Sequence, residues 1–497
     1  MCCLIDYLIV GSGPSSWAAS IACIEKGITP TLIDADNILD ETKFSKIEND
    51  YKEAMERNVQ SRFTNGLDFK KKYFLSEIPY PTQSSKIYDI DLIDSIYSRS
   101  SGGFSLVWGN ALLPFRTHDM LARNWSHEEL IYPDEYLKIL CNIGGAALNI
   151  DFFDFAVDPQ ISQLNLFSNS KINIDRWGRS MKIGASSLSI DTKSCVSCGK
   201  CLEGCLFGSL LETRTKFLDL ILSKKIKYIP NLVVKKFKNH GDRVIVECKD
   251  SLGKKHSLEV NNLLIGAGAM SSSILTAIST GVDKLEISDS QAATFPLIRL
   301  KRSTHSFYNN IELSDLFSQS FDKSGTLTSH VQIYPASRVT NEFYKKFFIP
   351  TRIIKYMSVG HIFFDPQKSG KIEIKGEIAN EVEGVQVVYK HRLLDKFSNM
   401  IKFISFFSFL IKNGVIPIPI IKFSKIGHSF HIGSTRGLIE NKEHSINQII
   451  SKNFRSVLVV DGAAIPHLPP GPPTLSIMTF SYKLTKKFIE DNLKLKN

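Results

Sequence analysis

Four cysteines within eleven residues form the densest group of candidate metal ligands in this 497-residue chain. The spacing C-x2-C-x2-C-x3-C is that of the thiolate ligands in bacterial iron–sulfur proteins, and it occurs here at Cys195, Cys198, Cys201 and Cys205. No second run of cysteines is present, although such proteins send the fourth cysteine to a second cluster. The spacing predicts a candidate [4Fe–4S] site, with a zinc site or a metal-free loop as alternatives.

A glycine-rich turn near the N-terminus, GSGPSS, is the second candidate site. It follows an apolar strand-like run and opens an alanine-rich helical stretch. Gly11 permits the tight turn, and Gly13 lets the backbone approach a pyrophosphate at the helix N-terminus. Ser16 replaces the third glycine of G-x-G-x-x-G and is small enough for helix–strand packing. Asp34 ends the next apolar strand, about 20 residues on, where an acid binds ribose hydroxyls, so the turn predicts dinucleotide binding.

The elements that must position these residues alternate between strand and helix. Residues 4–34 predict strand, turn, helix and strand, and residues 263–275 predict a buried strand and another glycine turn. Alternating apolar residues between 228 and 260 predict an antiparallel meander. After strand-like segments from about 290 to 430, the chain returns to a strand, a proline-rich bend and a final helix.

This order predicts an α/β fold (α+β overall). A Rossmann-like dinucleotide-binding domain is assembled from both ends and the middle of the chain, and a substrate or cap domain with a β-sheet is inserted. The predicted segments are 1–115, 211–290 and 431–497 for the dinucleotide-binding domain, 116–210 for a helical insertion with the cysteine loop, and 291–430 for the substrate domain.

Composition narrows the classes of function. With 43% hydrophobic and 22% charged residues, the chain is not disordered, collagen-like or a coiled coil. The net charge of +11 suits anionic ligands or membrane surfaces, but the scattered lysines form no basic stripe for nucleic acid. The Phe-rich stretch 400–411 is too short to span a bilayer, and predicts a buried cap helix or, alternatively, an interfacial anchor. We expect a cytoplasmic protein with at most peripheral membrane contact.

Several stretches together resemble the glucose–methanol–choline (GMC) family of flavin oxidoreductases, especially its broader branch that includes pyranose oxidase. They are VGSGPSS with LIDA, GGFSLVWGNALLPF, LLIGAGAMSSSIL, HIGSTRG and VLVVDGAAIPHLPPGPPTLSIMTFSY. The last is the most specific, because Asp-Gly after a strand, a proline bend and Pro-Thr-Leu opening the terminal helix match the family's flavin-contacting C-terminus. Residues 40–95 and 290–425 match no motif, as expected for the family's variable cap.

The resemblance implies FAD as the cofactor and suggests which residues bind it. The ADP half would be held by Gly11, Gly13, Ser16 and Asp34, with the backbone of Val234 beside the adenine. The pyrophosphate and isoalloxazine would lie along Gly103, Ser105 and Asn110, and the flavin pyrimidine would face Asp461, Gly462 and Thr474. Pyranose oxidase tethers its flavin through a histidine where this chain has Val107, so we predict non-covalent FAD.

The resemblance also implies an acid–base site. Family members oxidise an alcohol carbon, with a base taking the hydroxyl proton while a hydride leaves for the flavin. The family's histidine in H-x-G-[ST] corresponds to His431, and His428 is a nearby competitor. The second catalytic residue of the family, a His or Asn, is replaced by Pro472, which offers no side-chain hydrogen bond. Either His467 substitutes for it or the chemistry differs.

These features together predict an FAD-dependent dehydrogenase that oxidises a CH–OH group of a sugar, glycan or lipid-like alcohol. The electrons would pass to an acceptor other than oxygen, such as a protein partner, with the iron–sulfur cluster as the candidate exit route. The alternative is a flavoprotein without net alcohol oxidation: a redox relay, an isomerase or an inactive partner in a biosynthetic complex.

Overall fold

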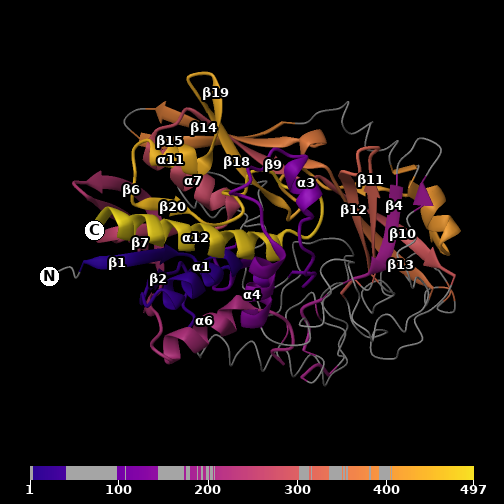
Figure 1. Ribbon diagram of the computed structural model, residues 1–497, viewed down its shortest axis with the longest axis horizontal. Helices are drawn as coiled ribbons and strands as arrows, with labels where there is room; N and C mark the ends of the chain where they lie inside the picture. Colours follow the sequence, from indigo (N-terminus) through magenta and orange to yellow (C-terminus); the bar gives the residue numbers. More distant parts are fainter. Residues whose placement is uncertain are drawn as a thin grey trace.

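Three β-sheets and the helices that cover them form the computed structural model (Figure 1). The structure describes residues 4–40, 98–106, 108–143, 173–174, 180–186, 188–191, 194–196, 201, 205, 207–300, 313–314, 316–334, 350, 353, 356–379, 382–390, 403–404 and 406–496. Figure 1 shows the strands of the first sheet at one end of the longest axis and those of the second sheet at the other.

The first sheet joins a parallel core to the predicted antiparallel meander. Its order is β5-β2-β1-β8-β7-β6, and β20 pairs with β8. The strands are β1 (Ile5–Val10), β2 (Thr31–Ile33), β5 (Lys227–Ile229), β6 (Leu232–His240), β7 (Arg243–Asp250), β8 (Lys255–Ile265) and β20 (Val457–Val459). Because β1 pairs in parallel with both β2 and β8, segments more than two hundred residues apart lie side by side and end at the same sheet edge.

The two ends of the chain share one hydrophobic core. Helix α1 (Pro14–Glu25) follows β1, and helix α12 (Thr474–Lys496) packs along it. Figure 1 shows α12 running from the first sheet to the middle of the molecule, so its N-terminus lies between the sheets. The other described helical elements are η2 (Gly103–Leu106), α3 (Thr117–Leu121), α4 (Pro133–Ile143), α6 (Thr213–Leu222), α7 (Ala269–Thr280), η6 (Pro366–Lys368) and α11 (Ile446–Ser451).

The second sheet is antiparallel, in the order β16-β10-β13-β12-β11-β4-β3, and β17 pairs with β10. Its strands are β3 (Asn173–Ile174), β4 (Ser180–Ala185), β10 (Ala292–Arg299), β11 (Leu316–Phe321), β12 (Leu327–Tyr334), β13 (Met357–Phe364), β16 (Val415–Pro417) and β17 (Lys422–Phe423). One face of this sheet is apolar and packs against Phe403, Phe406 and Phe409. The expected burial of the Phe-rich stretch is therefore observed for these three side chains, whereas Ile404 and Ile411 of the same stretch are exposed.

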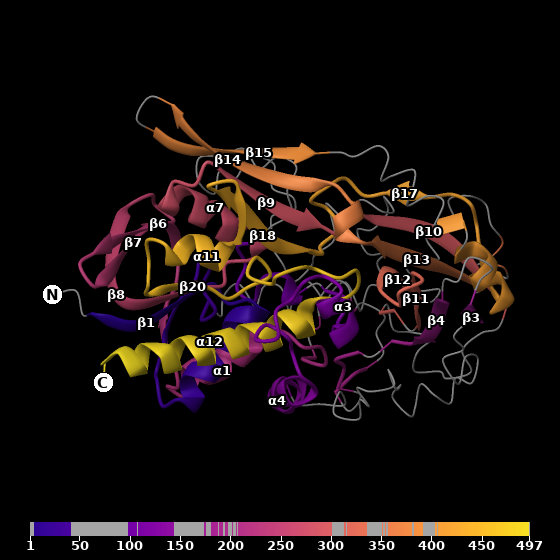
Figure 2. The same ribbon diagram turned by 45° about the horizontal axis from the view of Figure 1, so that its top comes forward.

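A third sheet carries the strand that follows His431. Its order is β15-β14-β9-β18-β19, with β9 (Lys284–Asp289), β14 (Lys371–Ala379), β15 (Val382–Lys390), β18 (Ile432–Ile439) and β19 (Lys442–Ser445). Figure 2 shows this sheet along one side of the molecule, from the first sheet towards the second. The chain runs from β8 of the first sheet through α7 to β9, and then directly to β10 of the second sheet. The third sheet therefore connects the other two.

The predicted α/β fold is confirmed: a Rossmann-like domain built from both ends and the middle of the chain, and an inserted sheet domain. Strand β4, from the predicted helical insertion 116–210, joins the second sheet, and the predicted domain boundaries themselves stay predictions. Within the described residues, every helix is too short or too polar to cross a bilayer.

Candidate active site

A cavity of about 250 Å³ opens at the carboxyl ends of β1 and β2. Three helices begin at its wall, because Pro14 of α1, Ala269 of α7 and Thr474 of α12 all line it. Helix α1 has no side-chain cap, so its first backbone N–H groups are available to a ligand. Convergent helix N-termini favour a negatively charged group such as a pyrophosphate.

Most residues predicted to contact the cofactor line this cavity. They are Gly11, Gly13, Asp34, Gly103, Val234, Asp461, Gly462 and Thr474. Gly11 has φ +85°, and a Cβ there would lie 2.9 Å from the carbonyl oxygen of Gly266, so only glycine fits the turn. A Cβ at Gly13 would have no atom within 4 Å, which leaves open space beside the backbone for a ligand. The cradle therefore fits the diphosphate of a dinucleotide.

The other three predicted cofactor residues support the cavity wall instead of lining it. The Ser16 hydroxyl donates to the carbonyl oxygens of Val10 (3.3 Å) and Gly266 (3.2 Å), which fixes α1 on the sheet as expected. Ser105 Oγ accepts from the backbone N–H of Thr213 at 3.0 Å. The side chains of Ser105 and Asn110 thus hold the second glycine turn near α6; Asn110 Oδ1 accepts from the Leu211 N–H at 3.1 Å.

Asp34 is buried where β2 ends at the cavity. Its carboxylate accepts from the Ser12 hydroxyl, whose oxygen in turn accepts from the Gly102 N–H at 2.7 Å. These bonds tie the first glycine turn to the second. Burial raises the pKa of Asp34 to about 6, against the opposing effect of the hydrogen bond from Ser12. The carboxylate is an acceptor of the type that binds ribose hydroxyls.

The carboxylate of Asp461 caps helix α7. One oxygen accepts from the Gly268 N–H at 2.8 Å and from the Ser272 hydroxyl, and the other accepts from the Ala463 N–H at 2.9 Å. Burial raises the pKa of Asp461 to about 6. With one carboxylate oxygen engaged at the start of α7 and the other at Ala463, Asp461 offers mainly backbone to a ligand in the cavity.

A buried carboxylate holds the loop that carries His431. Asp289 accepts from the Gly427 N–H at 2.8 Å and from the Ser429 hydroxyl, and Ser429 Oγ accepts from the His431 N–H at 3.0 Å. The carbonyl oxygen of His431 accepts from the Ser290 N–H at 3.0 Å. These bonds fix the backbone of His431 from both sides.

The chain neighbours of His431, Phe430 and Ile432, line the cavity, whereas His431 itself is not among the described residues that line it. The ring of His431 stacks on Phe363, with centroids 3.8 Å apart and planes 16° from parallel. Its Nδ1 is buried and has no hydrogen-bond partner. Burial, followed by the nearby His361 and His330, holds the pKa of His431 well below its usual value. The lowered pKa keeps the imidazole unprotonated at neutral pH, so that it can act as a base, although a weaker one than an exposed histidine.

His467 lies in a different environment from His431. Its carbonyl oxygen accepts from Trp125 Nε1 at 3.0 Å. Burial, and then Arg436, Arg123 and Lys371, lower the pKa of His467 to about 4. Like His431, it is not among the described residues that line the cavity.

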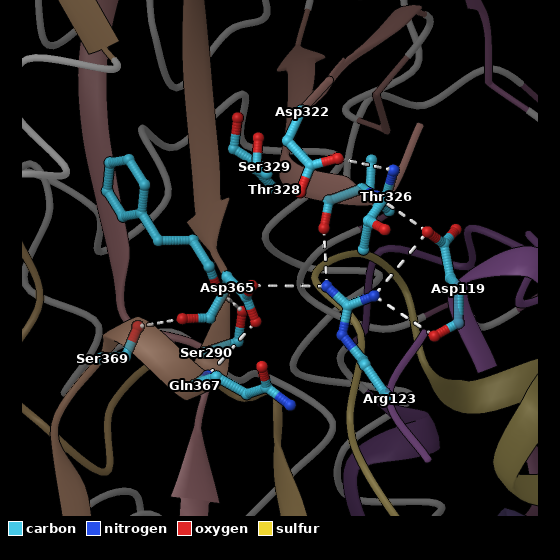
Figure 3. Close-up of polar contacts among 12 residues, drawn as sticks. Asp119, Arg123, Ser290, Asp322, Thr326, Thr328, Ser329, Asp365, Gln367 and Ser369 are labelled. Carbon is cyan, nitrogen blue, oxygen red and sulfur yellow. Dashed lines mark hydrogen bonds and ion pairs between the residues drawn. The ribbon is translucent and has the colours of Figure 1, made fainter. Parts of the chain in front are cut away.

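A buried arginine that the sequence gives no reason to single out, Arg123, lies in a network of polar contacts (Figure 3). It is close enough to His467 to help lower the pKa of that histidine. Arg123 Nη2 donates to the carbonyl oxygen of Leu327 at 2.6 Å and lies 3.4 Å from an oxygen of Asp365. Arg123 Nη1 lies 3.7 Å from Asp119 Oδ1, which itself accepts from the Leu327 N–H at 2.7 Å. These hydrogen bonds and ion pairs join α3 to the first residue of β12 and to the start of η6.

The second sheet turns a polar face away from its Phe-rich core, and the sequence analysis missed it. In the antiparallel register, His330 lies opposite both Gln319 and Phe363, which places all three on one face. His361 of β13 lies opposite Gln332, and its Nδ1 is 2.9 Å from Thr294 Oγ1. The signal was the alternation S-H-V-Q-I-Y along β12, with His, Gln and Tyr on one side.

The cysteine cluster gains no support as a metal site. Cys201 is buried in the apolar core behind the second sheet, and Cys195 and Cys205 pack against that core. Cys198 lies outside the described residues, as does Val107, on which the prediction of non-covalent FAD rests. Among the residues that the structure describes, no group of three or more His, Cys, Asp or Glu side chains could hold a metal ion. The predicted iron–sulfur cluster and the zinc alternative are therefore unsupported.

No family model matches the chain, and no curated protein is a significant match. Solved structures do match. A pyridoxine 4-oxidase from Mesorbium loti superposes with a TM-score of 0.54 at 13% identity, over 98% of this chain and 99% of the other. A formate oxidase from Aspergillus oryzae RIB40, studied for FAD modification, has a TM-score of 0.55 at 14% identity, over 99% of each chain. At these identities the likeness establishes that the chain has the fold of these two enzymes.

Proposed function

We propose that this protein is an FAD-dependent oxidoreductase of the GMC type that oxidises a CH–OH group to a carbonyl. The observation that carries the proposal is the position of His431, a neutral imidazole flanked by two residues of a cavity at which three helix N-termini converge. Bound FAD would supply the hydride acceptor, held by the first glycine turn, Asp34 and the start of α12. The names of two enzymes with the same fold, one of them studied for FAD modification, support the choice of cofactor.

In the proposed reaction, residues of this chain accept the proton and position the group that accepts it. His431 accepts the hydroxyl proton as the C–H hydrogen leaves with its electron pair for FAD, so the alcohol loses two electrons and two hydrogens. Phe363 fixes the plane of the imidazole by stacking, and the Asp289–Ser429 pair fixes its backbone. This support limits the motion of the base relative to the substrate.

The electron acceptor has to be reconsidered, because the cysteine cluster was the predicted exit route to an acceptor other than oxygen. That cluster has no support in the described part of the chain. Both enzymes that share the fold are named as oxidases, so we propose dioxygen as the first acceptor to test. The predicted substrate classes are a sugar, a glycan or a lipid-like alcohol, and the polar face of the second sheet favours the hydrophilic ones.

The test is anaerobic reduction of bound FAD. The purified protein is reconstituted with FAD and mixed with pyridoxine, formate, monosaccharides and simple primary alcohols, and the loss of flavin absorbance is followed. The His431→Ala variant should bind FAD normally but be reduced at least about 10²-fold more slowly. The surface variant His256→Ala serves as the control, because His256 pairs with Asp250 in the meander, away from the cavity.

Three results would contradict the proposal in different ways. Failure to bind FAD would remove the cofactor. Rapid reduction of His431→Ala would remove this histidine as the base. FAD that no donor reduces would favour the alternative of a flavoprotein without alcohol oxidation.

A further inference from the structure

The bend that leads into α12 cannot offer a side-chain hydrogen bond to a substrate. It consists of Pro469, Pro470, Gly471, Pro472 and Pro473. If the function proposed above is correct, deprotonation by His431 leaves negative charge developing on the substrate oxygen. A pre-organised donor would lower the energy of that charge. Such a donor has to come from an element that faces the bend.

The element that faces the bend is β12, through His330. This side chain is fully buried, and a Cβ on Gly471 would lie 3.5 to 3.7 Å from its ring atoms. Its partner across β13 is Phe363, the residue that stacks on His431. Phe363 is therefore a neighbour of both His330 and His431. Their imidazoles are close enough for His330 to help lower the pKa of His431.

Only one of the two ring nitrogens of His330 has a hydrogen-bond partner. Its Nδ1 lies 3.3 Å from Gln319 Nε2, and its Nε2 is buried with no partner. With the amide N–H donating to Nδ1, the ring proton lies on Nε2, which is then a buried donor without an acceptor. Leaving such a group unsatisfied costs about 1–3 kcal/mol, and native structures rarely do so without a reason.

His361, on the same face, is a weaker candidate for this role. Its Nδ1 already has a partner in Thr294 Oγ1, at 2.9 Å. Its ring makes an edge contact with Phe363, at 4.7 Å between centroids. His330, by contrast, lies against the proline bend at Gly471.

We propose that His330 is a second catalytic residue, whose Nε2–H donates a hydrogen bond to the substrate oxygen while His431 accepts the hydroxyl proton. His330 keeps its own proton throughout, so the proton and the hydride have the destinations given above. Gln319 is a positioning residue, because its amide sets the tautomer that puts the proton on Nε2. The unsatisfied nitrogen then finds its acceptor when the substrate binds.

The experiment compares two replacements of His330 in the FAD-loaded protein. His330→Phe keeps a flat ring able to stack on Phe317 but has no donor, and His330→Gln keeps an N–H donor that cannot titrate. With the donor that reduces wild-type FAD fastest, we expect His330→Phe to be reduced about 10²-fold more slowly and His330→Gln to recover much of the rate. His256→Gln is the matched control and should behave as wild type.

Two further readouts separate catalysis from folding. FAD affinity should be unchanged in both variants, since His330 is not among the described residues lining the cofactor cavity. The reduction potential of the bound FAD should be more negative in His330→Phe, because a donor that favours negative charge is lost. If His330→Phe does not fold, Gln319→Leu leaves His330 in place and should slow reduction about tenfold by freeing its tautomer.

The outcomes distinguish this inference from the proposed function. If no donor reduces the FAD bound to the wild-type protein, both the proposed function and the role of His330 are overturned. Suppose instead that a donor reduces the FAD of the wild-type protein, and reduces that of His330→Phe within about threefold of the same rate and at the same potential. That result overturns only the role of His330. Slow reduction of His330→Phe with retained FAD affinity, and recovery in His330→Gln, supports it.

Discussion

Among single residues, Asp34 makes the predicted cofactor site testable by pH. Burial raises its pKa to about 6, whereas ribose hydroxyls need the ionised carboxylate as acceptor. Lowering the pH through about 6 protonates Asp34 in the free protein, so FAD affinity should fall by about tenfold between about pH 7.5 and about pH 5. Asp34→Asn should bind FAD more weakly at about pH 7.5, with most of the pH dependence gone, as measured by titration of flavin fluorescence. A pH-independent wild-type affinity would contradict this role.

The residues that could be found from sequence are those whose function depends on local chain geometry. Gly11, Gly13 and Asp34 belong to one strand–turn–helix–strand unit, so their spacing alone predicts that they meet at a ligand. His330 has no such local motif. It lies beside Phe363 only because β12 pairs with β13, and against the proline bend only because Gly471, 141 positions later, leaves room for its ring. Cross-strand register of this kind is not encoded in any short stretch of sequence.

Among the elements, the Arg123 network connects α3 to β12, the strand that carries His330. Removing the guanidinium leaves the buried carboxylate of Asp365 without the cation it faces at 3.4 Å and the Leu327 carbonyl without its donor, while Asp119 keeps its pair with Arg116 at 2.6 Å. We expect Arg123→Met to lower the free energy of unfolding by about 3–5 kcal/mol. Arg243→Met, which breaks the exposed pair with Glu259, should cost less than about 1 kcal/mol. Urea unfolding of both variants measures the difference. Equal free energies of unfolding would show that the Arg123 network stabilises the protein no more than an exposed ion pair does.

Strands and helices with a strong pattern were predictable, and their grouping into sheets was only partly so. The meander β6–β7–β8 and helices α1 and α12 occur where the periodicity indicated. The third sheet was not foreseen, because β9 and β18 pair across about 140 residues and each is a short strand in a polar context. Pairing between distant segments depends on the shape of the whole core, which periodicity does not report.

At the scale of the whole molecule, the cofactor cavity is the place where distant segments meet. Its wall takes residues from the first glycine turn, from η2, from β6, from the start of α7, and from the bend before α12. These segments are otherwise held together by sheet pairing and by the packing of α1 against α12. A ligand that contacts all of them should stabilise the assembled protein and bind little to the unfolded chain.

Thermal unfolding tests this coupling with a pair of matched glycine variants. FAD at about 100 times its Kd should stabilise the wild-type protein by about 2.7 kcal/mol and raise its Tm by several degrees. Gly11 and Gly253 both have positive φ, +85° and +81°, so alanine strains the backbone at either site. Only at Gly11 does the added Cβ also meet backbone at 2.9 Å, and only Gly11 lines the cavity. Gly253→Ala should therefore lower the Tm slightly and keep the full shift with FAD, whereas Gly11→Ala should lose that shift. An equal FAD shift in both variants would mean that the cofactor does not bind at this turn.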